Sequence, residues 1–126
     1  MSSLHFFVYG TLRRGCENPH AELLARAGRF VGAGKVRGRL YRIDWYPGMT
    51  LGGEQWVIGD VFELNDPEAI EELDRYEGSN EYRRVKTTAW IENGEEQETE
   101  CWVYEYIGPV VESERIESGD WLKGNA

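Results

Sequence analysis

The sequence predicts a compact α+β fold, with one domain over residues 1–126, in which short helices flank a curved sheet. Asn18-Pro19 and Asp66-Pro67 are each typical of a helix start, because a capping side chain precedes a proline that suits the first helical position. Asn93-Gly94 lies between residues 82–91 and 98–107 and is a strong hairpin signal. Residues 30–43 are rich in glycine, which favours bent or bulged strands, with barrel-like curvature as one interpretation.

The first strand is expected at residues 4–9, where nearly every position is apolar, as in a central strand covered on both faces. Gly10 ends this strand. Residues 10–15 contain two glycines and two arginines and predict a loop, the kind of segment that often carries function. Consecutive arginines cannot both point into one small pocket, so Arg13 and Arg14 are expected to be solvated.

The first helix is expected at residues 19–27, with Asn18 as its N-cap. Two turns are expected after it, at residues 46–48 and 52–53, because both segments contain glycine and the first also contains proline. A strand is expected at residues 56–64, and it leads into the second helix.

The second helix is expected at residues 67–77. At the helical period, Ile70, Leu73 and Glu77 share one face, so Glu77 projects from the apolar stripe. An apolar environment disfavours the charged form of a carboxylate and raises its pKa toward the range useful for proton transfer near neutral pH. Glu77 is therefore the candidate general acid/base. Two other interpretations stay open: the helix frays and releases this side chain to solvent, or an arginine pairs with it.

Residues 82–91 and 98–107 are expected to pair as antiparallel strands around the Asn93-Gly94 turn. The C-terminal tail is mostly polar. We expect it to cross the surface of the domain and to dock Trp121.

Composition excludes several classes of function. The net charge of −9 repels nucleic-acid backbones and anionic lipid surfaces, so neither is an expected partner. No apolar run is long enough to span a bilayer and no signal segment is evident, so a cytoplasmic location is expected. Cys16 and Cys101 lie far apart and form no Cys-x-x-Cys pair, so no metal site is predicted. The sequence does not indicate an oligomeric state.

Several short segments occur in the order in which they occur in one known family. They are residues 7–15 (FVYGTLRRG), 46–48 (YPG), 59–62 (GDVF), 73–78 (LDRYEG) with 82–84 (YRR), and 116–121 (IESGDW). Each alone is a weak signal, but their order and combination extend over nearly the whole chain. The chain resembles the gamma-glutamylcyclotransferase-like superfamily, which includes the gamma-glutamylamine cyclotransferases and the AIG2-like proteins.

The resemblance implies a mixed, barrel-like sheet flanked by short helices, with a cavity beside the end of the first strand. It implies that Tyr9, Gly10, Thr11 and Leu12 bind the glutamyl part of a substrate, mainly through main-chain groups, and that Glu77 is the catalytic acid/base. In the implied reaction the α-amine of a γ-glutamyl amine or peptide attacks its own side-chain carbonyl. The amine or peptide is expelled as the 5-oxoproline ring closes. The resemblance implies no cofactor.

The residues leave alternatives open. Glu81 competes with Glu77 as the acid/base, but it follows Gly78 in a segment expected to be a solvated loop. Cys16 is an alternative nucleophile near the loop, but neither histidine has an evident role as its base. Arg83 and Arg84 point to opposite faces of a strand, so one of them can approach the end of the second helix. The alternative function is a non-catalytic domain that binds a small carboxylate-bearing metabolite.

Overall fold

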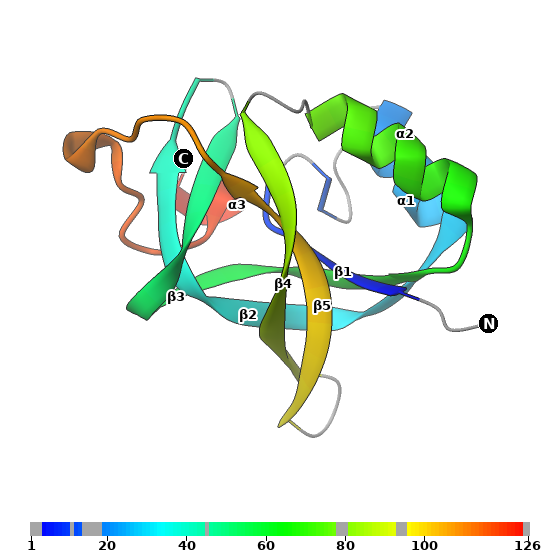
Figure 1. Cartoon of the computed structure of the whole chain (residues 1–126). Helices are drawn as coiled ribbons and strands as arrows, with labels where there is room; N and C mark the ends of the chain where they lie inside the picture. The colour runs from blue at the N-terminus through cyan, green and yellow to red at the C-terminus, as the bar shows by residue number, and fades with distance from the viewer. Residues whose placement is uncertain are drawn as a thin grey trace.

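The computed structural model describes residues 4–10, 12–13, 19–44, 46–77, 81–92 and 96–124, apart from the side chains at positions 20, 76, 77, 96 and 123. Within these residues the strands form a closed barrel in the order β1-β3-β2-β4-β5 (Figure 1). The strands are β1 (Leu4–Val8), β2 (Gly28–Arg42), β3 (Pro47–Leu64), β4 (Tyr82–Glu92) and β5 (Glu96–Tyr106). The helices are α1 (Pro19–Ala27), α2 (Pro67–Glu77), the 3-10 turn η1 (Glu112–Glu114) and α3 (Trp121–Gly124).

Strand β1 closes the barrel. It pairs antiparallel with β3 from Leu4↔Leu64 to Val8↔Asp60, and parallel with β5 at Phe6↔Trp102. The sheet is therefore mixed and barrel-like, as the resemblance implied.

The two faces of β1 are buried in different parts of the protein. Phe7 belongs to the cluster that fills the barrel, while Phe6 and Val8 belong to a second cluster with Leu24 of α1 and Leu73 of α2. Side chains alternate between the two faces of a strand, so a short strand with consecutive buried residues must be covered on both sides. The prediction of a central strand is confirmed.

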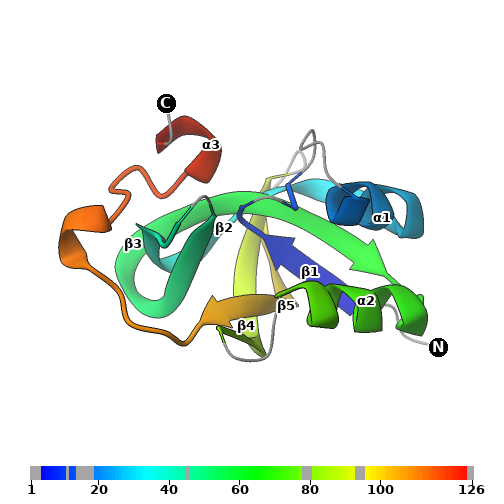
Figure 2. The same ribbon diagram turned by 90° about the horizontal axis from the view of Figure 1, so that it is seen from above.

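Helices α1 and α2 lie side by side at one end of the barrel, and the C-terminal segment with α3 lies at the other end (Figures 1 and 2). Both helices form where the sequence predicts them. Helix α2 begins at Pro67 because Asp66 caps it: its Oδ1 accepts a hydrogen bond from the Glu68 amide at 3.0 Å. The buried Leu24 and Leu73 anchor the helices to the outer face of β1.

The expected turn at residues 46–48 was wrong, because Pro47 and Gly48 are the first residues of β3 and pair with β2. The chain turns just before them, where the amides of Ile43 and Asp44 both donate to the Tyr46 carbonyl. Gly48 serves a close contact rather than a turn: a Cβ there would lie 2.7 Å from the Cβ of Tyr106.

The expected turn at residues 52–53 was also wrong. Gly52 and Gly53 have positive φ angles of 99° and 90°, but they lie inside a bulge of one continuous strand. Arg37 of β2 pairs with Trp56 and the next residue, Gly38, pairs with Leu51, so residues 52–55 are left out of the backbone pairing with β2. Such bulges bend a strand and increase its twist, which helps a sheet to close.

The C-terminal hairpin and tail agree with the predictions. Strands β4 and β5 pair antiparallel from Tyr82↔Tyr106 to Glu92↔Glu96, whereas Asn93-Gly94 lies outside the described residues. After β5 the chain crosses the barrel, and Trp121 is buried in the cluster that fills the barrel.

Gly119 gives the first testable prediction. Its φ is +72°, and a Cβ would lie 1.9 Å from the Trp56 carbonyl oxygen. In Gly52→Ala the added methyl meets nothing within 4 Å, so that variant should lose only the about 1–2 kcal/mol that a left-handed L-residue costs. Gly119→Ala should lose roughly 1–3 kcal/mol more, because overpacking is added to the same backbone strain. Urea unfolding of both variants measures the difference, and equal losses would contradict the contact.

Candidate active site

The loop after β1 packs tightly against the start of β3. The amide of Arg13 donates to the Gly10 carbonyl at 3.2 Å, which closes a tight turn. Gly10 is buried, and a Cβ there would lie 2.7 Å from Cγ of Pro47, so only glycine permits this approach. Leu12 is buried among the residues that pack under α2. Thr11 lies outside the described residues.

Tyr9 joins three parts of the barrel. Its ring is buried, and its hydroxyl donates to the Tyr104 carbonyl at 2.7 Å and accepts from the Met49 amide at 3.2 Å. A buried hydroxyl is stable only when it is hydrogen-bonded, and here strand β5 and strand β3 supply both partners. The Tyr9 side chain therefore fixes the point at which the loop begins. Its part in binding substrate stays a prediction.

Tyr104 extends this connection to α2. Its own hydroxyl donates to Oδ1 of Asp74 at 2.7 Å, and Nε of Arg84 lies 3.1 Å from the same oxygen. Arg84 thus approaches the second helix, one of the alternatives that the sequence left open. The start of the loop and the last turn of α2 are held together through one residue, Tyr104.

Glu77 is the last residue of α2, as predicted, and it follows Asp74 by three positions. Residues three apart are neighbours on a helix surface, so the backbone of Glu77 lies next to the position from which Asp74 meets Tyr104. The Glu77 side chain lies outside the description. Its role as acid/base therefore stays a prediction.

Aromatic side chains support the same region, which we call the loop–helix junction (Gly10, Leu12, Pro47, Asp74 and Tyr104). The hydroxyl of Tyr82 donates to the Pro47 carbonyl at 2.6 Å. The rings of Tyr82 and Tyr106 meet edge to face, with centroids 5.4 Å apart. These contacts fix Pro47, and Pro47 in turn limits the position of Gly10. The junction combines a tight glycine loop with the end of an acidic helix, an arrangement that suits recognition of a small polar ligand and proton transfer.

The family to which the chain belongs follows from comparison with known proteins. A model of the family described as gamma-glutamyl cyclotransferase, AIG2-like, matches residues 6–123. The chain belongs to this family. It is 32% identical over 122 residues to the gamma-glutamylcyclotransferase family protein YtfP of Escherichia coli K12, with 94% of this chain and 96% of that protein covered.

Solved structures in the comparison share the cyclotransferase fold. The uncharacterized protein PH0828 from Pyrococcus horikoshii matches with a TM-score of 0.73 and 26% identity, over 96% of this chain and 92% of that chain. An AIG2-like protein from Mus musculus matches with a TM-score of 0.71 and 25% identity, over 90% of this chain and 83% of that chain. None of the described helices is long and apolar enough to cross a membrane.

Glu81, the alternative acid/base of the sequence analysis, is exposed and accepts a hydrogen bond from another side chain. Its Oε2 accepts a hydrogen bond from the hydroxyl of Tyr46 at 2.7 Å. This bond and burial raise the pKa of Tyr46 to about 12. The Glu81 carboxylate thus forms a hydrogen bond with Tyr46 at the protein surface.

The sequence did not indicate the buried ion pair of Arg13. We expected Arg13 to be solvated, but its side chain is only 12% exposed and forms an ion pair with Asp120 at 2.7 Å. No sequence signal pairs two residues 107 positions apart. Their proximity follows only from the course of the C-terminal tail.

A hollow of about 310 Å³ lies elsewhere, against Arg42 and residues 113–118. It is open and contains none of the predicted site residues. Its arginines already face acidic neighbours, because Arg42 lies 3.9 Å from Glu114 and Arg115 lies 3.3 Å from Glu112. This hollow therefore adds no candidate to the site.

Tyr46 gives the second prediction. Because its folded-state pKa of about 12 lies above the ordinary 10.0, its bond to Glu81 stabilises the fold fully below pH 10 and loses that effect as the pH rises through 12. Glu81→Ala removes the acceptor and should lower the pKa of Tyr46 toward 10. Carbon-13 NMR of labelled tyrosine, assigned with Tyr46→Phe, follows the titration. Asp44→Asn, which removes the weakest of the causes, should change it much less, and equal shifts would contradict the assignment.

Proposed function

We propose that this chain is an enzyme that cyclises a γ-glutamyl amine or peptide to 5-oxoproline and releases the free amine. Glu77 acts as the general acid/base, and the main chain from Tyr9 to Leu12 binds the glutamyl group. The observation that best supports the proposal is the hydrogen-bonded connection from Tyr9 through Tyr104 to Asp74, because it brings the loop and the last turn of α2 together. Membership of the cyclotransferase family gives independent support.

The reaction needs one group that first accepts and then donates a proton. The α-ammonium of the substrate loses a proton to the Glu77 carboxylate, and the resulting amine attacks the side-chain carbonyl carbon. A C–N bond forms, and the carbonyl oxygen becomes an oxyanion. The oxyanion then collapses, the C–N bond to the leaving amine breaks, and Glu77 returns the proton to that nitrogen. The ring nitrogen, which became cationic in the attack, loses its second proton through the regenerated Glu77 carboxylate, and the released amine takes up that proton as an ammonium ion. Two protons thus pass from the α-nitrogen to the leaving nitrogen, and no electrons are gained or lost.

The loop contributes orientation and electrostatic stabilisation. Amide groups at a tight turn can bind a carboxylate or a developing oxyanion without a charged side chain. The substrate must also fold so that its own amine reaches its own carbonyl, and a rigid loop can hold it in that form. Gly10 packed against Pro47 and Tyr9 bonded inside the barrel supply this rigidity.

Asp74 has a different role in this proposal. Its Oδ1 accepts a hydrogen bond from the Tyr104 hydroxyl and forms an ion pair with Arg84. Two partners, from β5 and β4, therefore fix its position. It holds the helix in place beside the loop. Glu77, one turn further along the helix, is then the carboxylate that transfers the proton.

Glu77→Gln gives the third prediction. General acid/base groups contribute roughly a hundredfold to ten-thousandfold in rate, so kcat for 5-oxoproline formation should fall by at least about a hundredfold. A panel of γ-glutamyl amines and γ-glutamyl dipeptides is incubated with the purified protein, and 5-oxoproline is quantified by mass spectrometry. The matched control is Glu81→Gln, which removes a carboxylate four residues further on and should leave kcat within about twofold.

Three results would contradict the proposal, in whole or in part. Wild-type protein that forms no 5-oxoproline from any member of the panel would exclude the activity over that substrate range. Saturable binding of 5-oxoproline or a γ-glutamyl compound without turnover would instead favour the binding-domain alternative. Full activity in Glu77→Gln would exclude this residue as the acid/base while leaving the reaction itself in place.

A further inference from the structure

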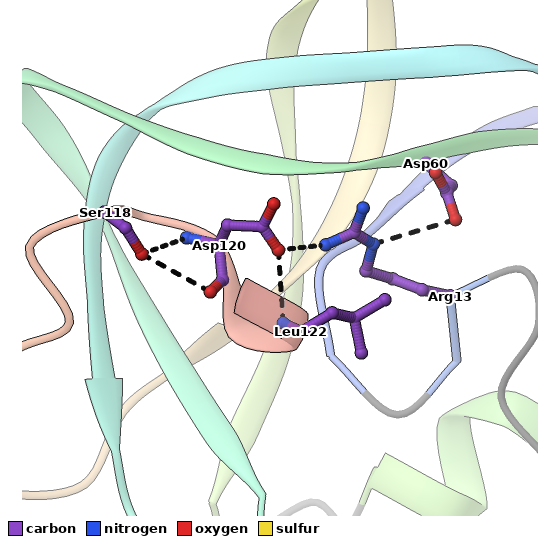
Figure 3. A network of polar contacts seen from close by, with 5 residues as sticks. All are labelled: Arg13, Asp60, Ser118, Asp120 and Leu122. Carbon is purple, nitrogen blue, oxygen red and sulfur yellow. Dashed lines mark hydrogen bonds and ion pairs between the residues drawn. The ribbon is translucent and has the colours of Figure 1, made fainter. Parts of the chain in front are cut away.

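We propose that Arg13 and Asp120 are a positioning pair, through which docking of the C-terminal segment (residues 116–122) fixes the substrate-binding loop. The inference rests on the proposed function, since it assigns the loop its role. It concerns two residues that lie 107 positions apart and that sequence reasoning left without a function. Figure 3 shows the contacts that connect them.

Arg13 is held between two carboxylates. Its Nη1 donates to Oδ1 of Asp120 at 2.7 Å, and its Nε lies 3.7 Å from Oδ2 of Asp60. All three side chains are largely buried, with 12%, 21% and 9% of Arg13, Asp120 and Asp60 exposed. Water screens such an arrangement much less than it screens a surface pair, so loss of one partner has a large effect.

Arg13 connects the loop back to the place where it leaves the barrel. Its amide returns to the Gly10 carbonyl, and its side chain reaches back toward Asp60. Asp60 is the β3 residue paired with Val8, the last residue of β1. The loop therefore begins beside Asp60, and the Arg13 side chain returns to Asp60.

Nε of Arg13 is buried and makes no hydrogen bond to any residue that the structure describes, since Asp60 Oδ2 lies 3.7 Å away. A buried donor without an acceptor is costly, so the guanidinium needs a strong bond elsewhere to stay in this position. The contact with Asp120 is that bond, because a short charge-assisted hydrogen bond is about twice as strong as a neutral one. Arg13 thus depends on the tail for its buried position.

Asp120 is itself firmly placed. The same Oδ1 that binds Arg13 accepts the Leu122 amide at 3.1 Å, and the Asp120 amide donates to Oγ of Ser118 at 3.2 Å (Figure 3). One oxygen atom therefore caps the short helix α3 and anchors the loop. Any movement of this part of the tail is transmitted to Arg13.

The rest of the segment is attached to the barrel. The Ile116 amide donates to the Leu40 carbonyl at 2.7 Å, and the Ile58 amide donates to the Gly119 carbonyl at 2.7 Å. Trp121, next to Asp120, is only 4% exposed. The tail is therefore a rigid support, and its last link to the loop is the pair Arg13 and Asp120.

Asp120→Asn tests the pair while it keeps the cap of α3. The amide oxygen of asparagine still caps Leu122, because asparagine is as good an N-cap as aspartate, but the charge that binds Arg13 is lost. We expect kcat/KM for 5-oxoproline formation to fall roughly tenfold to a hundredfold, since a displacement of about 1 Å in a positioning element has an effect of that size. The apparent Kd of 5-oxoproline, measured by calorimetry, should rise by a similar factor.

Controls separate positioning from general stability. Glu114→Gln removes the exposed ion pair with Arg42 near the same tail and should change neither kcat/KM nor the Kd. Arg13→Lys keeps the charge and should retain more activity than Arg13→Gln. The double variant Arg13→Gln with Asp120→Asn should be no worse than the more impaired single variant, because both remove one interaction.

The outcomes decide between support and rejection. Amide hydrogen exchange at Gly10 and Leu12 that accelerates in Asp120→Asn but not in Glu114→Gln supports the pair, whether or not the wild-type protein turns over the substrates tried. Wild-type kinetics and exchange in Asp120→Asn would reject it, and so would additive losses in the double variant. Failure of the proposed function is recognised separately, by wild-type protein that forms no 5-oxoproline.

Discussion

The insertion of β1 between β3 and β5 is the constraint on which the rest of the structure depends. Phe6 and Phe7 are neighbours in sequence, yet one packs under the helices and the other fills the barrel. A slip of one residue would exchange these two faces, so the register of β1 is strongly specified. That register places Val8 opposite Asp60 and fixes where the loop begins. The position of the loop–helix junction therefore follows from the packing of a five-residue strand.

Side chains fill the interior of this barrel, so the space for a ligand lies at its rim. Val36, Met49 and Val57 are fully buried in its interior, and barrels with about eight strands are the smallest that enclose a ligand. The side chain of Tyr9, directly after β1, also enters the interior, and main-chain groups there bind its hydroxyl. The chain that follows Tyr9 leaves the filled interior: Leu12 packs in the cluster with Leu73, and Arg13 extends to Asp60 and Asp120.

Much of the fold was predictable because it is determined locally. The caps and apolar stripes of the two helices and the hairpin turn signal are short-range features, and both helices and both hairpin strands form within about two residues of the expected bounds. The strand expected at residues 56–64 is longer and begins at Pro47. The errors concern glycine. Gly48 and Gly52 indicated turns, but Gly48 makes room for Tyr106 and Gly52 lies in a bulge. A glycine needed for a long-range contact cannot be distinguished in sequence from a glycine needed for a turn.

The candidate site was predictable in part for the same reason. The loop was visible as a break after an apolar strand, and Glu77 was visible on a helical stripe. The roles of Tyr104, Asp74 and Arg13 were not, because each depends on a partner from a distant strand or from the tail. Resemblance to a family supplied the link between loop and helix, and the bonds through Tyr104 give that link a physical basis.

The charge balance around the loop explains how so acidic a protein can accept the proposed substrate. Asp60 and Asp120 flank Arg13, and Asp74 contacts Arg84, so two arginines offset two of these three carboxylates. A γ-glutamyl group carries both an α-ammonium and an α-carboxylate, and its net charge at that end is zero. It therefore meets little repulsion from a net charge of −9 that lies mostly on exposed surfaces. The remaining requirement is orientation, and a loop fixed at Tyr9, Gly10 and Arg13 is suited to provide it.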